Sequence, residues 1–517
     1  MKIDKTLNLF SRMQSPKKRM MKNIQKLGVM LLLTVMISAC TDGFDAVNTN
    51  PNQPTEVGSE ALVPSAIRSS VNAHVTMSYL VGNNIGQITA KTLRIQVDSY
   101  QWNSFNNFVW SPLYETLRDV ESLHGVAVEE GNTAAQGVAL VLRAWIYSIL
   151  TDAYGDIPYS EAIGADEDVL FPAYDTQEEI YLGPNGIIAT LSEASSLLSS
   201  TTSTLNGDIL YDGDVQKWEQ LANALQLRLW LRVSDKVPSQ AASALQSLVS
   251  QGNLMSGVND GGMLTYLETS PNIYPTFQLK VGDFDAVAIS SRAVDSLSNW
   301  NDPRLEIYAR PANAPVPTGD DPRYLGYING ALEGGNTSLL GYRYYNYAGH
   351  QTSASRAKGI IMTHAEQEFI LAEAAQRGMI SADAKAHYDA GVISSMLQYN
   401  AETLFPYTSI NGVTFDSPAD YMAQPSVDFA SAEDKLERIA SQKWVALFFT
   451  GLEPWFDWRR TGRPAMEPTL NNINNDVVPV RFRYPGDEPL LNKANYDAAV
   501  SRIGGDNINS EMWLVQE

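Results

Sequence analysis

Cysteine is nearly absent from this sequence, in which Cys40 is the only one among 517 residues. A single thiol cannot close a disulfide within the chain, and it cannot build a cysteine-rich metal site. The apolar share of 44% in a chain of this length is enough for a large hydrophobic core. The fold therefore needs no disulfides, and the position of Cys40 needs an explanation of its own.

Catalytic signatures are missing as well. The sequence contains no HExxH, GxSxG or P-loop pattern, and no GxGxxG follows a predicted strand. The acid- and glycine-rich loops "DGDVQ" and "GVNDGG" match no EF-hand pattern, so no metal is predicted. No cofactor is expected either. We expect a protein that is not an enzyme, with hydrolysis of glycans or peptides as the alternative.

Basic residues are too few to balance the acids. The chain has 37 Lys and Arg against 58 Asp and Glu, a net charge of −21. Residues 1–39 hold eight of the basic side chains and a single acid, so the remainder carries a net charge of −28. A body this acidic repels the phosphates of nucleic acids and has little electrostatic attraction to an anionic membrane. No nucleic-acid partner is expected.

Long hydrophobic runs are also lacking. The apolar run near the amino terminus extends only from Leu27 to Ala39, about 13 residues, whereas a membrane-spanning helix needs ~20. This length, after a cationic stretch, is typical of a signal peptide. We assign residues 1–39 to it, with Met20 or Met21 as candidates for the true start.

Cys40 follows Ile37, Ser38 and Ala39, an aliphatic residue and two small ones. This arrangement resembles the lipobox of bacterial lipoproteins, in which the cysteine thiol is joined to diacylglycerol and becomes the new amino terminus. We expect a covalent lipid on Cys40 that anchors the protein to the membrane. The alternative is a buried core cysteine after an ordinary signal peptide. The polar stretch that follows predicts a flexible tether over 40–59 and a single body over 60–517.

Periodicity in the body favours amphipathic helices that occur as neighbouring pairs. The predicted helical scaffold covers mainly 60–250 and 361–460. Within it the segment 175–200 is expected to start at a cap on Asp175 or Thr176. Segments rich in Gly, Asn, Pro and Tyr alternate with the scaffold at 255–360, 402–430 and 462–517. We predict a mainly α fold with an irregular, loop-rich and partly β region.

Several blocks of the sequence carry a family resemblance when they are taken in order. They include "LTDAYGDIPYSEA" at 150–162, "PAYDTQEEIY" at 172–181, "NDPRLEIYA" at 301–309 and "IASQKWVALFFTGLEPWFDWRRTGRP" at 439–464. In this order the chain resembles the SusD/RagB family of nutrient-binding outer-membrane lipoproteins, in its SusD-like branch, over essentially the whole mature chain.

The resemblance implies a fold of tetratricopeptide-like helix pairs. It also implies a cell-surface lipoprotein of the outer membrane of a Gram-negative bacterium. Such a protein sits on a SusC-like, TonB-dependent β-barrel transporter, captures an oligosaccharide or peptide, and is not an enzyme. The alternatives are a hydrolase on the same surface and an adhesin without a role in transport.

Candidate ligand-binding residues are aromatic side chains that stand among amides, because flat rings cover sugar faces and amides bond hydroxyl groups. The stretch "DSYQWNSFNNFVW" at 98–110 fits this description, and we select Tyr100, Trp102 and Asn103. Trp110 is left out, since its spacing marks the start of a core-facing helix. Sugar and peptide sites both use such residues, so the ligand class stays open.

Two further candidates come from "YLETSPNIYPTFQ" at 266–278, namely Asn272 and Tyr274, and Trp300 lies a little beyond them. The alternating tyrosines at 341–351 form a third candidate stretch for ligand binding, for which we favour the alternative of a half-buried strand.

Three other motifs favour a structural interpretation. "GDIPYSEA" ends a helix and packs a turn. "GLEPWFDWRRTGRP" follows an apolar helix, and its Asp457, Arg459 and Arg460 are expected to satisfy one another. His364 and Glu368, one helical turn apart, are interpreted as a solvated helix face rather than a metal site.

Overall fold

The computed structural model of the chain describes residues 57–163, 169–267, 269–312, 324–333, 335–345 and 357–516. The chain divides into two units, 1–57 and 58–517, and the description below concerns the second. The predicted signal peptide, Cys40 and nearly all of the predicted tether lie outside the described residues. Their assignments stay predictions.

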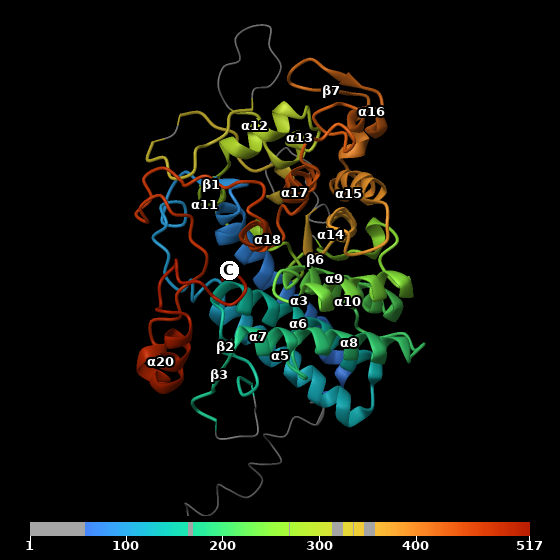
Figure 1. Cartoon of the computed structure of the whole chain (residues 1–517), viewed down its shortest axis with the longest axis vertical. Helices are drawn as coiled ribbons and strands as arrows, with labels where there is room; N and C mark the ends of the chain where they lie inside the picture. Colours follow the sequence, from blue (N-terminus) through green and yellow to red (C-terminus); the bar gives the residue numbers. More distant parts are fainter. Residues whose placement is uncertain are drawn as a thin grey trace, which may run out of the picture. The chain divides into compact units, whose positions relative to one another are not determined.

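Helices dominate the described chain, which confirms the mainly α fold. The larger ones are α3 (Ser59–Met77), α5 (Trp110–Glu130), α6 (Thr133–Tyr154), α7 (Gln177–Leu182), α8 (Ile187–Ser199), α9 (Val215–Arg232), α10 (Pro238–Gln251), α14 (His364–Gln376), α15 (Ala384–Tyr399), α17 (Lys435–Ala446) and α18 (Glu453–Thr461). Sequential helices pack on one another: α5 on α6, α8 on α9, α9 on α10, and α14 on α15 (Figure 1). This pairing is the one expected from the sequence.

The predicted helix over 175–200 is wrong in one respect, because the structure has two helices there. Thr176 caps α7 in a capping box with Glu179, as predicted. The helix then ends at Gly183, where Pro184 has no backbone N–H to continue it. The chain re-enters a helix at Ile187, and α8 packs against α6.

Helix α6 is the central element of the first half. It is long and apolar enough to cross a membrane by composition, but 83% of its most apolar window is buried inside the protein. This is the pattern of a core helix. It ends at Gly155, whose φ of 86° lies in the left-handed region that favours glycine.

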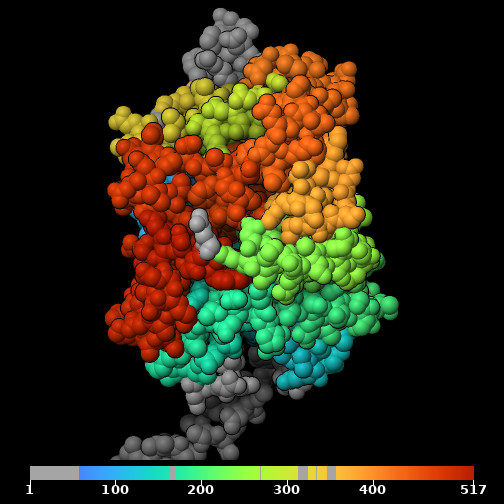
Figure 2. All heavy atoms as spheres, viewed as in Figure 1, coloured from blue at the N-terminus to red at the C-terminus, as the bar shows by residue number. Residues whose placement is uncertain are grey.

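The irregular segments contain short elements rather than bare loop. These are η2 (Val258–Asp260), η3 (Pro275–Gln278), α11 (Val281–Phe284), α12 (Ser291–Asn299), α13 (Leu305–Tyr308), η4 (Tyr342–Tyr344), η6 (Ala401–Leu404), α16 (Pro418–Met422), α19 (Glu488–Leu491) and α20 (Lys493–Arg502). Helices α12 and α20 were not expected. The predicted strand at 341–351 is wrong where the structure describes it, since η4 is a 3₁₀ turn. The C-terminal segment spreads over the surface beside the first-half helices (Figure 2).

Among the described residues, four antiparallel strand pairs complete the fold: β1 (Thr89–Lys91) with β5 (Val287–Ile289), β2 (Ile157–Pro158) with β3 (Tyr174–Asp175), β4 (Gly262–Thr265) with β6 (Lys358–Met362), and β7 (Tyr407–Thr408) with β8 (Thr414–Phe415). The β1–β5 pair joins segments almost 200 residues apart, with Lys91 opposite Val287. This pairing fixes the point from which the loop at 92–109 departs.

A close crossing of backbones fixes the first helix against the end of the scaffold. Helix α3 runs on through a π-helical turn, η1 (Ser78–Gly82), into α4 (Asn83–Ile85). A Cβ atom on Gly82 would lie 2.1 Å from the carbonyl oxygen of Gly451. The imidazole of buried His74 in α3 also packs against Gly451. Burial lowers the pKa of His74 to about 3. Only glycine allows this approach.

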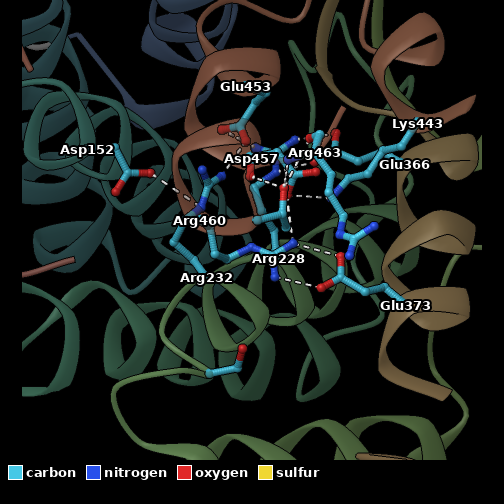
Figure 3. A network of polar contacts seen from close by, with 12 residues as sticks. Asp152, Arg228, Arg232, Glu366, Glu373, Lys443, Glu453, Asp457, Arg460 and Arg463 are labelled. Carbon is cyan, nitrogen blue, oxygen red and sulfur yellow. Dashed lines mark hydrogen bonds and ion pairs between the residues drawn. The ribbon is translucent and has the colours of Figure 1, made fainter. Parts of the chain in front are cut away.

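A buried network of ion pairs joins four helices that are far apart in sequence (Figure 3). Arg228 of α9 donates two hydrogen bonds to Glu366 of α14, at 2.6 and 2.7 Å. Arg232, one turn further along α9, donates to Glu453 at the start of α18. All of these side chains are buried. Burial opposes ionisation of Glu453, but Arg232 and Arg228 hold its pKa below the usual range.

The second half of the network surrounds Asp457 of α18. Its Oδ1 accepts from Lys443 of α17 at 2.9 Å and from Arg460 at 2.8 Å. Arg460 also donates twice to Glu373 of α14, at 2.6 and 2.7 Å. Arg459 takes no part in this pairing and donates instead to backbone oxygens of Asp152 and Val480. The predicted buried network is therefore present with Arg460 and without Arg459.

Removing one charge from the network should destabilise the protein strongly. We expect Glu453→Gln to lower the free energy of unfolding by about 3–5 kcal/mol, because Arg228 and Arg232 would keep buried charges without full compensation. Urea unfolding followed by circular dichroism measures this. Glu178→Gln, at an exposed site in the first turn of α7, is the control and should change stability by less than about 0.5 kcal/mol. Equal midpoints for the two variants would contradict the role of the network.

The backbone crossing gives a second expectation. Gly82→Ala should destabilise the fold by about 3 kcal/mol, because the new methyl group meets a carbonyl that cannot move aside. Gly125→Ala in α5 meets nothing within 4 Å and should stabilise by about 1 kcal/mol. Thermal unfolding of both variants should move the midpoint in opposite directions.

Candidate functional site

A cleft of about 580 Å³ opens beside the loop at 92–109. We call it the loop cleft, and it is lined by Tyr79, Leu80, Val81, Lys91, Leu93, Arg94, Gln96, Val97, Gln101, Asn103, Phe105, Phe108, Leu279, Gly282, Asp283 and Ala286. Turn η1, strand β1 and helix α11 thus supply its walls, and the loop supplies most of its polar groups. Amides, exposed apolar side chains and cations meet in one place.

The loop is held in shape by buried polar contacts. The Asp98 carboxylate accepts the backbone N–H of Lys91 at 2.7 Å and the Asn329 amide at 3.2 Å. Arg94 and Tyr100 have φ values of 57° and 58°, a left-handed conformation that few non-glycine residues adopt. Such strain persists only where the surroundings impose it, and it clusters at ligand sites.

Tyr100 and Trp102 do not form the exposed platform expected from the sequence. Trp102 is only 5% exposed, and its ring contacts Trp455 and Phe482 edge to face, each at 5.5 Å between ring centres. Its indole N–H donates to the Val97 carbonyl at 2.7 Å. Tyr100, 4% exposed, packs on Trp102. Rings from the far end of the chain pack on Trp102, and both Trp102 and Tyr100 are buried, so the expected exposure is wrong.

The neighbouring side chains of the same stretch take the outward positions. Gln101 and Asn103 are exposed, and both line the loop cleft. Phe108 is 42% exposed and lines the same cleft. The predicted residue Asn103 is therefore at a cleft, whereas the ring exposed there belongs to Phe108, which the sequence reasoning did not select.

Asn272 and Tyr274 line neither this cleft nor the second one described below. Tyr274 is fully buried and packs edge to face on Tyr266 at 5.1 Å. Asn272 is half-buried, and its carbonyl closes a turn with Leu267. The expectation that Tyr274 is exposed is wrong, because its ring fills the core beneath η3.

Trp300 lies at a second cleft of about 570 Å³, which we call the Trp300 cleft. Arg292 lies there with its guanidinium 5.1 Å from the centre of the buried Trp444 ring. Its lining is Gln87, Ser291, Arg292, Asp295, Ser296, Trp300, Ile328, Asn329, Glu437, Ser441, Trp444, Pro464, Ala465, Glu467, Pro468, Thr469 and Leu470. The residues selected from the sequence therefore do not form one site.

The two clefts differ in charge. Three carboxylates line the Trp300 cleft, and its one cation, Arg292, already bonds Gln87 at 2.9 Å. The loop cleft instead contains Lys91 and Arg94 against a single exposed carboxylate, that of Asp283.

Burial controls the titration of groups around the loop cleft. It lowers the pKa of Lys91 to about 8, against the opposing attraction of Asp98. It raises the pKa of Asp98 to about 6 and that of Tyr79 well above its ordinary value. Sequence reasoning missed Lys91, although a lysine inside the apolar run "ITAKTL" was a visible signal.

The "GDIPYSEA" motif has a structural role in this fold. Asp156 accepts from the backbone N–H of Gln177 at 2.9 Å and from Arg502 of α20. The Tyr159 ring packs on Tyr147 at 4.6 Å. The motif thus joins the end of α6 to the C-terminal segment.

His364 and Glu368 are buried, so the interpretation as a solvated helix face is wrong. Burial alone would raise the pKa of Glu368, but hydrogen bonds with His364 and His387 lower it to about 2. Within the described ranges, no group of three or more His, Cys, Asp or Glu side chains is placed to hold a metal ion. The contact ties α14 to α15.

Known structures resemble this chain closely in fold. A SusD homologue of Bacteroides fragilis matches with 24% identity, a TM-score of 0.74, and 89% of this chain and 100% of that chain covered. An outer-membrane protein of Bacteroides vulgatus linked to nutrient binding matches with 28% identity, the same TM-score and the same coverage. A chitin-binding SusD homologue of Flavobacterium johnsoniae matches with 22% identity, a TM-score of 0.70, and coverage of 88% and 99%.

No curated protein shows a significant match to the chain. A family model does match, over residues 51–485, and its description is starch-binding associating with outer membrane. That range includes the loop cleft, the Trp300 cleft and the buried ion-pair network. The chain therefore belongs to the SusD-like family of nutrient- and glycan-binding proteins associated with the outer membrane.

Proposed function

We propose that this protein is a lipid-anchored receptor of the cell surface that captures an oligosaccharide in the loop cleft. The observation that carries the proposal is the lining of that cleft, where exposed amides of Gln96, Gln101 and Asn103 stand beside the exposed ring of Phe108. A concave, mostly apolar site with a few polar groups is typical of small-ligand binding. Membership of a glycan-binding family supports the same conclusion.

These side chains suit the binding of an oligosaccharide better than its hydrolysis. Sugar rings offer apolar C–H faces to a phenyl ring and hydroxyl groups that amides can both donate to and accept from. The cleft has one exposed carboxylate, Asp283, whereas glycoside hydrolysis ordinarily needs a pair. Binding without turnover is the function favoured, and a peptide ligand is the alternative.

The captured ligand would pass to a SusC-like, TonB-dependent barrel in the outer membrane. This part of the proposal rests on the family, which is described as associating with the outer membrane. Mild detergent extraction followed by co-purification would identify the barrel or, by its absence, favour an adhesin.

Attachment to the membrane is assigned to a diacylglycerol group on Cys40. We expect Cys40→Ser to move the protein from the membrane fraction to the soluble fraction, because acyl chains contribute ~0.8 kcal/mol per buried CH₂ and no other anchor is proposed. Fractionation and immunoblotting measure this. Ser38→Thr, which keeps the thiol, is the control for processing of the signal peptide. Retention of the Cys40→Ser variant in the membrane would contradict the lipid anchor.

The site assignment is tested by calorimetric titration with neutral oligosaccharides, including maltooligosaccharides and N-acetylchitooligosaccharides. For the glycan that binds, Phe108→Ala should weaken affinity about 5- to 10-fold through the loss of ring contact. Phe171→Ala, at an aromatic residue 60% exposed and outside the cleft, is the matched control. Asn103→Ala should also weaken binding. If Trp300→Ala alone reduced affinity, the ligand would belong to the Trp300 cleft.

A further inference from the structure

Two cations of the loop cleft lack partners in a chain that otherwise has a large excess of acid. Lys91 is only 9% exposed, yet in the described part of the chain its ammonium has no ion pair and no hydrogen bond. The ammonium lies over the Tyr79 ring, 5.2 Å from the ring centre. Arg94, exposed on the same cleft, also has no ion pair among the described residues.

Three other buried cations are paired with carboxylates, unlike Lys91. Arg228, Arg304 and Arg460 each bond a carboxylate with two nitrogen–oxygen contacts of 2.9 Å or less. A buried charge without a partner is costly, so folded proteins normally pair it. The pairing group for Lys91 is therefore missing from the described chain itself.

Asp98 does not supply that group. Its carboxylate oxygens accept the backbone N–H of Lys91 and the side-chain amide of Asn329, and no ion pair forms with the Lys91 ammonium. Asp283 lines the cleft but is exposed, and its carbonyl oxygen accepts the Tyr79 hydroxyl at 2.9 Å. The ammonium remains available to a ligand in the cleft.

We infer that the loop cleft selects glycans that carry a carboxylate, such as uronic-acid oligosaccharides, and pairs that carboxylate with Lys91 and Arg94. This inference rests on the proposed function and adds the chemical class of the ligand. A ligand carboxylate would supply the ion pair that Lys91 lacks among the described residues. Gln96, Gln101 and Asn103 line the same cleft, and their amides can bond the hydroxyl groups of a sugar.

The test compares charged ligands with neutral copies of the same shape. Oligogalacturonate, oligomannuronate and oligoglucuronate are titrated into the protein at pH 7, each beside its methyl ester. We expect at least one acid to bind about 10- to 100-fold more tightly than its ester, which is the range for a hydrogen bond to a charged group.

Substitutions locate the charge that is responsible. Lys91→Met should abolish the preference for the acid over the ester while leaving the affinity for the ester in place. Arg94→Gln, at an exposed position that does not endanger folding, should reduce the preference. Lys280→Met is the control. Lys280 is exposed and follows the cleft residue Leu279 in the sequence, but it lines neither cleft. Its preference should equal that of the wild type.

The pH dependence gives an independent reading. Tyr79, Arg94, Asp98 and Asp283 surround Lys91 at the cleft. The pKa of Asp98 is raised only to about 6 and that of Tyr79 is raised well above its ordinary value, so neither group titrates with its midpoint between pH 7 and 9. Because the pKa of Lys91 is lowered to about 8, the acid preference should fall as pH rises from 7 to 9. It should not fall in Lys91→Met.

Three outcomes would overturn the inference. Acid and ester could bind equally, the preference could survive both substitutions, or an oligoglutamate peptide could bind more tightly than every uronate. In the first case the proposed capture of glycans would still stand. If neither uronates, esters nor neutral oligosaccharides bound, the proposed function itself would fail.

Discussion

The contact between Arg232 and Glu453 holds together the parts of the structure on which the candidate site depends. It fixes the start of α18 against α9, and Arg228 links the same carboxylate region to α14. Because unpaired charges are unfavourable in a protein interior, arrangements of these helices that break the pairs are disfavoured. Helix α18 then presents Trp455, against which Trp102 packs. The loop at 92–109 is therefore positioned by an ion pair well over 100 residues away in sequence.

The loop divides its side chains between two roles. Its large aromatic rings, Tyr100 and Trp102, turn inward and anchor the backbone, whereas Gln101 and Asn103 remain at the surface. A loop anchored in this way needs little further ordering when it binds, which favours affinity. The loop cleft consequently offers polar contacts from an anchored loop, rather than a flat aromatic platform.

Much of the fold follows from local physics and was predictable. The cap at Thr176, the stop at Gly155 and the helical periodicity of α9 and α14 are properties of short stretches of sequence. The break at Gly183 and Pro184 was also visible but was missed. At the site, the stretch 98–110 was selected for ligand binding, which stays a prediction; Asn103 lies at a cleft, while Trp102 was wrongly taken to be exposed. Lys91 was missed altogether, since burial of its amine depends on η1 and α11.

The sequence by itself determined the proposed fate of the amino terminus, the helix pairs and the family, because each depends on local pattern or on ordered blocks of residues. The proposed lipidation of Cys40 rests on its immediate neighbours alone. Only the tertiary structure decided which aromatic residues are buried and which cations lack partners. The physical reason is that the partners of Trp102 are Trp455 and Phe482, more than 350 residues further along the chain. Periodicity and composition carry no information about contacts at that distance.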